Sequence, residues 1–323
     1  MRFGVLSTAK IGREDVIPGI QASDHEVLAI ASRDADRAAT VAADLDIPRS
    51  YGSYEALLAD DDLDAVYIPL PNALHAEWTR AAADEGLHVL CEKPLATDAE
   101  SAAALHDYCA DRGVTLMEAF MYRFHPRTER AAEIVQTELD GVHAVDATFK
   151  FALRGRPDDI RLNPELAGGS VMDVGCYAIS AARLFLGEPD TVTAHTHDSR
   201  DSGVDTDMAG LLSYDDGSLA RVASGFDTPA TQTYRVEAEN GWLAVEEAFD
   251  VSGPATLTYA VDGREVTETF DPADHYRLEV EHFADCAAAG RQLRIDAAET
   301  AANMAVIDAV YESAETGDSV VID

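Results

Sequence analysis

The sequence predicts an α/β protein: a doubly wound parallel sheet in its first part, then an α+β domain with an open, largely antiparallel sheet. Strand and helix signals alternate up to about residue 122, and the strands are nearly all apolar, which is typical of parallel sheets covered on both faces. From about residue 143 strands follow one another directly. The 323 residues suffice for two domains, which we place at 1–122 and 123–323.

The first part reads as a regular alternation of elements. Its strands are predicted at 2–7, 26–32, 64–69, 87–91 and 114–118. Alanine-rich helices are predicted between them, at about 12–22, 34–44, 72–85 and 98–112. The first strand follows Met1 at once, so we expect no signal peptide.

The second part reads as a sheet backed by helices. Its strands are predicted at 143–152, 190–197, 206–214, 217–226, 232–239, 241–246, 256–260 and 265–270. Its helices are predicted near 125–138, 170–187, 275–289 and 296–315. Turn sequences at 215–217 and 240–241 indicate hairpins. An open sheet of this size needs its other face covered, and we expect a homodimer or homotetramer formed through it.

The charge is strongly acidic, with 60 Asp and Glu against 24 Lys and Arg and a formal net charge of −36. Such repulsion opposes folding in dilute buffer, but at about 1 M salt the Debye length of about 3 Å screens it. We therefore expect a protein of a salt-rich cytoplasm. Acidic runs such as 60–62 predict a solvated shell. Nucleic acid and anionic membranes are polyanions, and we expect neither as a partner.

No apolar run reaches the length of a membrane span, so we expect no membrane segment. The four cysteines are scattered and lack C-x-x-C spacing, which favours a reducing compartment without disulfides or a metal site.

One lysine stands at the end of a buried strand. The chain has only three lysines, and Lys93 lies in Glu92-Lys93-Pro94 directly after the strand at 87–91. Ligands of open α/β sheets bind outside the carboxyl ends of the strands, so Glu92 and Lys93 are candidates to meet a cofactor or substrate. Pro94 restricts the backbone of Lys93. The alternative is a surface lysine.

The first strand is followed by a loop suited to a dinucleotide. The residues that take the place of a glycine-rich loop there are Ser7, Thr8, Ala9, Lys10 and Ile11. Small side chains let a pyrophosphate approach the backbone, and helix N-terminal N–H groups bind anions.

The second strand ends in Ser32 and Arg33, where an NAD-binding sheet usually carries an acidic residue. These two residues, with Arg37 one turn later, favour the 2′-phosphate of NADP, and NAD is the less favoured cofactor. Asp34 and Asp36 weaken this interpretation, and the arginines could instead lie on an exposed helix start.

Two further segments carry candidate residues. Leu70, Asn72 and His75 follow the strand at 64–69 on the ligand side of the sheet, although His75 could merely cap and pack the next helix. Asp173 and Tyr177 are four residues apart and so share one face of a helix. A helical tyrosine is more often core than catalytic, but an acidic neighbour and a lysine favour the catalytic interpretation.

Together these motifs resemble the Gfo/Idh/MocA oxidoreductases, in which a Rossmann nucleotide-binding domain is joined to an open-sheet substrate domain. The resemblance rests on Glu92-Lys93-Pro94, the segment from Pro71 to His75, and the helix with Asp173 and Tyr177. Segments 118–126 and 159–177 look most like the branch with glucose-fructose oxidoreductase, dihydrodiol dehydrogenase and NADP-dependent D-xylose dehydrogenases. The Ser7/Ala9 loop departs from the glycine-based pattern.

The resemblance implies a sugar dehydrogenase that oxidises the anomeric carbon of an aldose, D-xylose by preference, to its lactone. Tyr177 would be the base, because a nearby cation such as Lys93 can lower the pKa of a phenol by about 1–3 units. Asp173 would orient the sugar or the lysine. By resemblance, Arg161 would lie near the cofactor and Tyr122 near the substrate, with Tyr276 a weaker candidate. The alternatives are a dehydrogenase of another polyol (inositol, dihydrodiol, glucose) and a non-catalytic dinucleotide-binding regulator.

Overall fold

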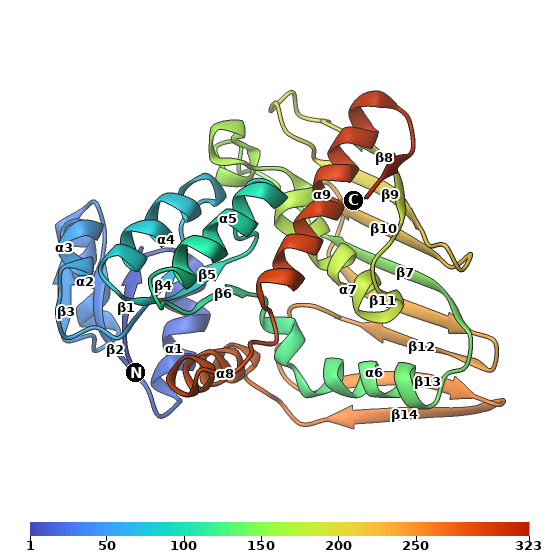
Figure 1. The fold of residues 1–323 in the computed structure, drawn as a ribbon, viewed down its shortest axis with the longest axis horizontal. Coiled ribbons are helices and arrows are strands. Elements are labelled where there is room, and N and C mark those ends of the chain that lie inside the picture. Colours follow the sequence, from blue (N-terminus) through green and yellow to red (C-terminus); the bar gives the residue numbers. More distant parts are fainter. Residues whose placement is uncertain (323) are drawn as a thin grey trace. The chain divides into compact units, whose positions relative to one another are not determined.

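The computed structural model describes residues 1–322, which form two compact units (Figure 1). The first comprises Met1–Phe124 and Asp274–Ala301, and the second comprises His125–Ala273 and the residues from Ala302 onward. The predicted division assigned everything after residue 122 to the second domain. That division is wrong for Asp274–Ala301, because the apolar side of the helix at 275–289 packs on the first unit.

The first unit contains a six-stranded, all-parallel sheet, so the predicted doubly wound sheet is confirmed. Its order is β3-β2-β1-β4-β5-β6. The strands are β1 (Arg2–Leu6), β2 (Glu26–Ala31), β3 (Arg49–Tyr51), β4 (Ala65–Ile68), β5 (His88–Glu92) and β6 (Leu116–Ala119). The order reverses between β1 and β4, and ligands of such sheets bind at that reversal.

Helices cover the sheet of the first unit, with α4 and α5 on one side and α1 and α8 on the other (Figure 1). The helices are α1 (Ile17–Gln21), α2 (Ala35–Asp44), α3 (Tyr54–Leu58), α4 (His75–Asp84), α5 (Ala99–Ala110) and α8 (His275–Ala289). A π-helical turn, Gly12–Val16, precedes α1. Asp34, Asp98 and Asp274 cap the starts of α2, α5 and α8. Part of the acidic excess therefore stabilises helix N-termini.

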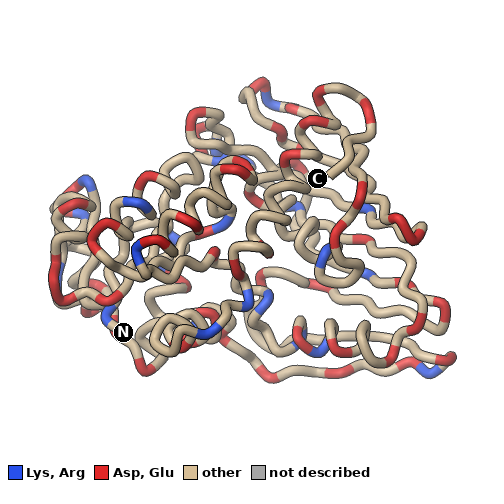
Figure 2. The backbone as a smooth tube through the Cα atoms, in the orientation of Figure 1, with Lys and Arg blue, Asp and Glu red and all other residues tan. Residues whose placement is uncertain are grey.

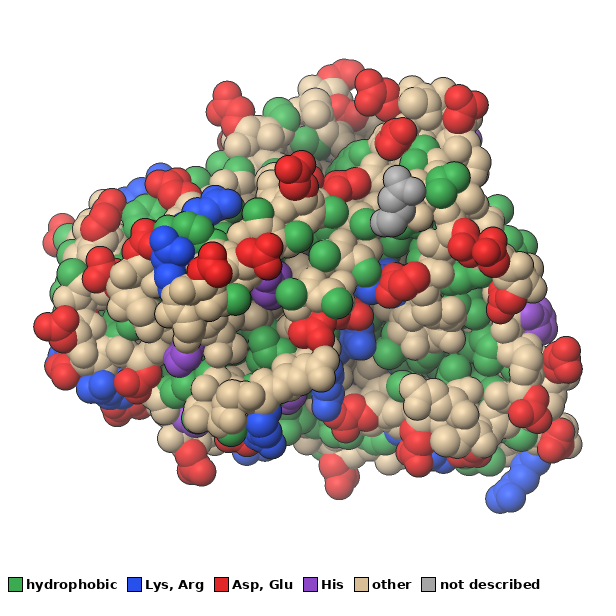
Figure 3. Space-filling view, viewed as in Figure 1, with side chains coloured by type: hydrophobic (Ala, Val, Ile, Leu, Met, Phe, Trp, Pro, Cys, Tyr) green, Lys and Arg blue, Asp and Glu red, His purple; other side chains and the backbone are tan. Residues whose placement is uncertain are grey.

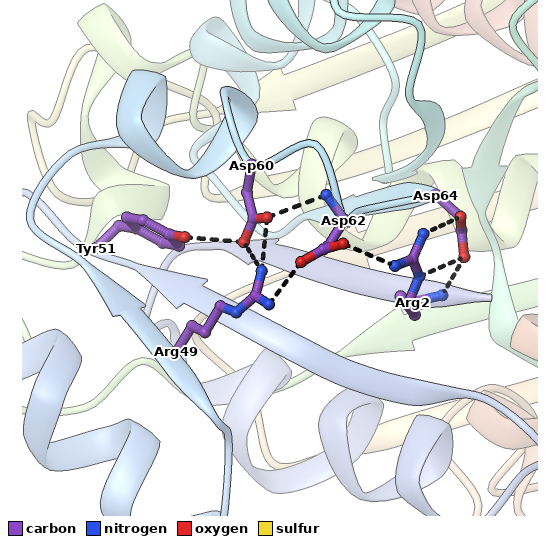
Figure 4. A network of polar contacts seen from close by, with 6 residues as sticks. All are labelled: Arg2, Arg49, Tyr51, Asp60, Asp62 and Asp64. Atoms are coloured by element: carbon purple, nitrogen blue, oxygen red, sulfur yellow. Dashed lines mark hydrogen bonds and ion pairs between the residues drawn. The ribbon is translucent and has the colours of Figure 1, made fainter.

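Acidic residues also form a network of ion pairs in the first unit (Figure 4). The Asp60 side chain is only 6% exposed and lies 2.7 Å from Arg49 of β3. Asp64 lies 3.0 Å from Arg2 of β1, and Asp62 contacts both arginines. Hydrogen bonds from Arg49 lower the pKa of Asp60. The expectation that run 60–62 belongs to a solvated shell is thus wrong for Asp60, because Arg49 binds it.

The second unit contains a nine-stranded sheet in the order β14-β13-β12-β11-β7-β10-β9-β8-β15. Only β7 and β10 pair in parallel, so the predicted largely antiparallel sheet is confirmed. Its strands are β7 (Val142–Lys150), β8 (Thr191–His197), β9 (Asp207–Ser213), β10 (Leu219–Gly225), β11 (Thr231–Ala238), β12 (Gly241–Glu246), β13 (Ala255–Val261), β14 (Arg264–Phe270) and β15 (Val320–Val321).

Helices pack on one face of this sheet, as the burial pattern shows. On β7, Val145, Ala147 and Phe149 are buried against the helices, while the residues between them face the other way. These helices are α6 (Pro126–Thr137), α7 (Cys176–Leu186) and the larger part of α9 (Ala297–Thr316). Within residues 1–322, no helix of the second unit covers the opposite face.

The hairpin predicted at 240–241 is present, but its glycine is needed for packing. A Cβ on Gly241 would overlap the carbonyl oxygen of Ala260 on β13. Any side chain there would therefore push β12 and β13 apart.

Acidic residues are dispersed along the backbone of both units (Figure 2), and their side chains are dispersed over the face seen in Figure 3. Within residues 1–322, no helix is both long and apolar enough to cross a bilayer.

Candidate functional site

The predicted site residues divide between the two units. The first unit holds Ser7, Thr8, Ala9, Lys10, Ile11, Ser32, Arg33, Arg37, Leu70, Asn72, His75, Glu92, Lys93, Tyr122 and Tyr276. The second unit holds Arg161, Asp173 and Tyr177. Each group is described within its own unit.

The loop after β1 is a compact turn into the π-helical segment. The Ser7 hydroxyl accepts a hydrogen bond from the Ala9 N–H at 3.0 Å, and the Thr8 carbonyl accepts one from Arg13 Nε at 3.1 Å. The Lys10 side chain is 75% exposed and lies 3.4 Å from Glu14. The loop thus places small side chains and a helix start at the carboxyl end of β1, an arrangement suited to a pyrophosphate.

The end of β2 carries two exposed cations. Arg33 and Arg37 are exposed, and Arg33 lies near enough to Tyr54 on α3 to oppose the rise that burial causes in the pKa of that phenol. Asp34 uses its carboxylate to cap α2 by accepting from the Arg37 N–H at 3.1 Å. Asp34, one of the two acidic residues that weakened the prediction of a phosphate site, is therefore engaged in capping, and both guanidinium groups are exposed at the end of β2.

The end of β5 is held by side chains from neighbouring strands. The Tyr67 hydroxyl of β4 donates to Glu92 Oε1 at 2.7 Å, and the Lys93 N–H donates to Glu92 Oε2 at 3.3 Å. The Lys93–Pro94 bond is cis. Burial and the charge of Glu92 raise the pKa of Tyr67 well above its ordinary value. Tyr67 therefore remains a proton donor that holds Glu92 beside Lys93.

His75 braces two loops of this region. Its ring is completely buried, with Nε2 2.7 Å from the Leu70 carbonyl oxygen and Nδ1 2.8 Å from the Pro94 carbonyl oxygen. Burial lowers the pKa of the ring. Because both nitrogens face backbone carbonyls, we assign His75 to positioning the backbone next to Lys93 rather than to direct cofactor contact.

Two buried carboxyl groups of this region were not predicted from sequence. Glu118 of β6 accepts from the Leu95 N–H at 2.9 Å, and Glu279 of α8 hydrogen-bonds the Phe120 N–H. Burial, with the charge of Glu92 adding to it, raises the pKa of Glu279 well above its ordinary value. The sequence did hold a signal for the burial of Glu279, because its spacing to Val280 and Phe283 puts all three on the buried stripe of α8.

The remaining candidates of the first unit are aromatic. Tyr122 is fully buried and packs edge-on against Phe120 at 5.5 Å. Tyr276 is half-buried at the start of α8, where its ring packs edge-on against His275 at 4.7 Å.

The second unit brings together an arginine and two carboxylates. Arg161 Nε donates to Asp173 Oδ2 at 2.6 Å, and its Nη1 donates to Asp159 Oδ1 at 3.2 Å. The negative charge of Asp173, with a smaller contribution from Asp159, raises the pKa of Arg161 above its ordinary value. Arg161 therefore fixes the carboxylate of Asp173 on the π-helical turn Val171–Gly175.

Tyr177, one helical turn after Asp173, lies in an aromatic cluster. Its ring packs edge-on against Phe149 of β7 at 5.3 Å and lies 5.5 Å from Phe249. Tyr177 is 4% exposed. Packing on two sides fixes the plane of the ring, which is what a positioned acid or base requires.

Within residues 1–322, no group of three or more His, Cys, Asp or Glu side chains is placed to hold a metal ion. The first unit carries small side chains and exposed arginines at strand ends and a lysine beside a glutamate. The second unit carries a tyrosine one helical turn after an ion-paired aspartate.

Both units match known family models. Residues 1–120 match the oxidoreductase family with an NAD-binding Rossmann fold, and residues 129–244 match the GFO/IDH/MocA C-terminal domain. The chain is 63% identical over 325 residues to D-xylose 1-dehydrogenase (NADP(+)) 2 of Haloferax volcanii, covering 100% of both chains. It is 29% identical to D-xylose 1-dehydrogenase [NADP(+)] of Haloarcula marismortui, with 100% of this chain and 93% of that one covered.

Solved structures agree with this assignment. The 3-ketoreductase KijD10 of Actinomadura kijaniata, in complex with NADP and TDP-benzene, superposes with a TM-score of 0.92 at 31% identity over 97% of both chains. Aldose-aldose oxidoreductase of Caulobacter crescentus gives a TM-score of 0.92 at 27% identity over 99% of both chains. This chain therefore belongs to the GFO/IDH/MocA family of oxidoreductases.

Proposed function

We propose that this protein is an NADP-dependent aldose 1-dehydrogenase that oxidises D-xylose to its lactone. The observation that carries the proposal is its 63% identity, over the full length of both chains, to a D-xylose 1-dehydrogenase (NADP(+)). Lys93, Asp173 and Tyr177 would supply the proton chemistry that this reaction needs.

The residues of the first unit fit NADP. Ser7 and Ala9 keep the loop after β1 small where a pyrophosphate would approach, and Arg33 and Arg37 are exposed at the end of β2 for a 2′-phosphate. A phosphate pairs with guanidinium through charge-assisted bonds that a ribose hydroxyl does not make. When bound, NADP⁺ supplies the acceptor for the hydride that leaves C1.

The side chains of this chain would manage the proton. Tyr177 takes the proton of the anomeric hydroxyl, and Lys93 stabilises the phenolate that makes this possible. Asp173, held by Arg161, orients the sugar through a second hydroxyl. These roles rest on the chemistry of the residues.

The test is a screen of NADP⁺ reduction over pentoses, hexoses and inositols in concentrated KCl, repeated with NAD⁺. D-xylose with NADP⁺ should give the highest kcat/KM, and the product should be the lactone or its hydrolysed acid. A higher kcat/KM with inositol or a dihydrodiol than with D-xylose would show that the proposed substrate is wrong. If no sugar is turned over although NADP⁺ still binds, the protein is a dinucleotide-binding regulator and not an enzyme.

We further propose that the enzyme is a homodimer or homotetramer of a salt-rich cytoplasm, assembled through the helix-free face of the second unit's sheet. Ion pairs neutralise part of the acidic charge on this face: Asp146 with Arg221, Glu237 with Arg235 at 3.0 Å, and Asp207 with Lys150 at 2.9 Å. In a protein of net charge −36, a face whose acidic residues are partly paired is one where two copies would meet with less repulsion.

Replacing Arg235 with glutamate would unbalance that face, because it pairs with Glu237 and stacks 4.5 Å from the ring of Trp242. Sedimentation velocity in molar KCl should then show a smaller assembly. Arg291→Glu, the same change on an exposed side chain of the first unit, is the control. An unchanged assembly in Arg235→Glu would rule out this face.

A further inference from the structure

The helical segment that carries Asp173 and Tyr177 starts at a buried carboxylate that the proposed reaction does not use. Asp205 Oδ2 accepts the Val171 N–H at 2.9 Å and the Ser170 hydroxyl at 2.7 Å. The Asp205 carbonyl oxygen accepts the Ser170 N–H at 2.9 Å. Asp205 is 8% exposed, so one buried residue receives three donors from the start of this segment.

The same carboxylate is tied to two further elements. The Tyr311 hydroxyl of α9 donates to Asp205 Oδ1 at 2.9 Å. Ser170 is itself fully buried, and its hydroxyl oxygen lies 2.9 Å from the hydroxyl oxygen of Ser224 at the end of β10. Burial and Asp205 raise the pKa of Tyr311 well above its ordinary value, so its phenol stays a donor.

Asp205 leaves no room for a side chain at Gly169, the glycine just before this segment. Gly169 has φ +120°, and a Cβ there would overlap Asp205 Oδ1 and lie 3.0 Å from the Tyr311 hydroxyl oxygen. The Asp173 N–H in turn donates to the Gly169 carbonyl at 3.0 Å. The backbone of Asp173 therefore depends on how closely Gly169 packs against Asp205.

We propose that Asp205 is a positioning residue for the reaction, acting through Ser170 and Val171 and held in place by Tyr311; this rests on the proposed function, in which Tyr177 is the base. A buried carboxylate is costly unless its hydrogen bonds are made, so loss of one donor would shift the group or the segment that it holds. Tyr177 follows Val171 by about 9 Å along the helix axis. A displacement of about 1 Å at a reacting group can lower the rate by about 10²-fold.

Two conservative variants and one matched control test the proposal. Tyr311→Phe removes the donor to Oδ1, and Asp205→Asn keeps the shape but removes the charge. Ser313→Ala removes a different hydroxyl of α9, fully buried, which accepts from the Ala194 N–H at 2.9 Å and donates to the Asp318 carbonyl at 2.6 Å. The measurements are kcat with D-xylose, the Kd for NADP⁺, and hydrogen exchange of segment 168–177.

Tyr311→Phe and Asp205→Asn should each lower kcat about tenfold or more. Their Kd for NADP⁺ should be unchanged, and exchange of segment 168–177 should be faster. Ser313→Ala should leave that exchange and kcat at wild-type values even if its thermal midpoint falls. Normal kcat in both site variants would overturn the proposal, as would wild-type exchange of the segment. Wild-type turnover tests the proposed function separately, and the exchange measurement is decisive even for a protein without turnover.

Discussion

Arg33 is the residue on which cofactor choice should depend. Its exposed guanidinium can pair with a 2′-phosphate, and a charge-assisted bond contributes about 1.5–3 kcal/mol, or one to two powers of ten in affinity. Arg33→Ala should weaken NADP⁺ binding by that factor and leave NAD⁺ binding nearly unchanged. Isothermal titration with each cofactor measures the difference. Arg264→Ala, which removes an exposed positive charge from β14, controls for net charge. Equal losses for both cofactors would contradict the assignment.

Tyr177 and Lys93 should determine how the rate depends on pH. Tyr177→Phe keeps the ring that packs on Phe149 but removes the proton acceptor, so kcat should fall about 10²–10⁴-fold. Lys93→Met should shift the alkaline rise of kcat to higher pH, because an unassisted phenol ionises later. The two losses should not add, since each residue acts through the other.

The control for the tyrosine is Tyr214→Phe, the same chemical change at a buried tyrosine of the second unit. Its kcat should stay near wild type. Near-normal turnover of Tyr177→Phe, or an unshifted pH profile of Lys93→Met, would show that the proton leaves by another route.

Among the elements, long and periodic segments could be predicted and short ones could not. The apolar runs that became β1, β4 and β5 have a strong pattern in sequence, whereas β3 is Arg49-Ser50-Tyr51, with no buried residue to mark it. The two-residue β15 forms only because β8 offers it an edge. Local sequence carries no signal for a strand whose stability comes from its neighbour.

Part of the candidate site could be proposed from the sequence alone. Lys93, Asp173 and Tyr177 could be named because strand ends and helix faces bring such residues to ligands, and their roles stay predictions. Glu279 was missed because its place beside Glu92 depends on α8 returning to the first unit, a contact between distant parts of the chain. Asp205 was missed because its loop has no periodic pattern.

The loops after β4 and β5 should depend on His75. His75→Leu keeps the bulk but removes the one N–H that the neutral ring can donate to the Leu70 or Pro94 carbonyl, so unfolding free energy should fall by about 1–3 kcal/mol. Lys93 adjoins Pro94, so kcat should fall as well. Thermal melts and steady-state rates measure the two effects.

His106→Leu is the control, since this buried histidine lies on α5. Burial lowers the pKa of His106 to about 4, below that of an unfolded histidine near 6.5. Its neutral form therefore supports the fold above pH 6.5, and that support is lost as pH falls toward 4. The control should keep normal kcat and become less acid-sensitive than wild type. A His75→Leu enzyme with the same rate and stability as this control would refute the bracing role.

For the whole molecule, the decisive quantity is the net charge of −36. Much of the acid is not free: Asp60 binds Arg49, and other aspartates cap helices. The remainder repels across the surface, and in dilute buffer that repulsion is unscreened. The thermal midpoint should therefore rise steeply between dilute and molar KCl, and activity should fall on dialysis. Equal midpoints in both would contradict the halophilic interpretation, and sucrose at matched osmolality separates screening from exclusion.

The scarcity of lysine leaves few side-chain amines in this chain for covalent labelling. Lys93 is only partly exposed, and Lys150 is held by Asp207 with its side chain 23% exposed, whereas the Lys10 side chain is 75% exposed. An amine-reactive dye at limiting dose should therefore attach mainly at Lys10 among the lysines, at the loop after β1. A fluorophore there would report on dinucleotide binding without any engineered cysteine, and the same bond would tether the enzyme to a surface in one orientation.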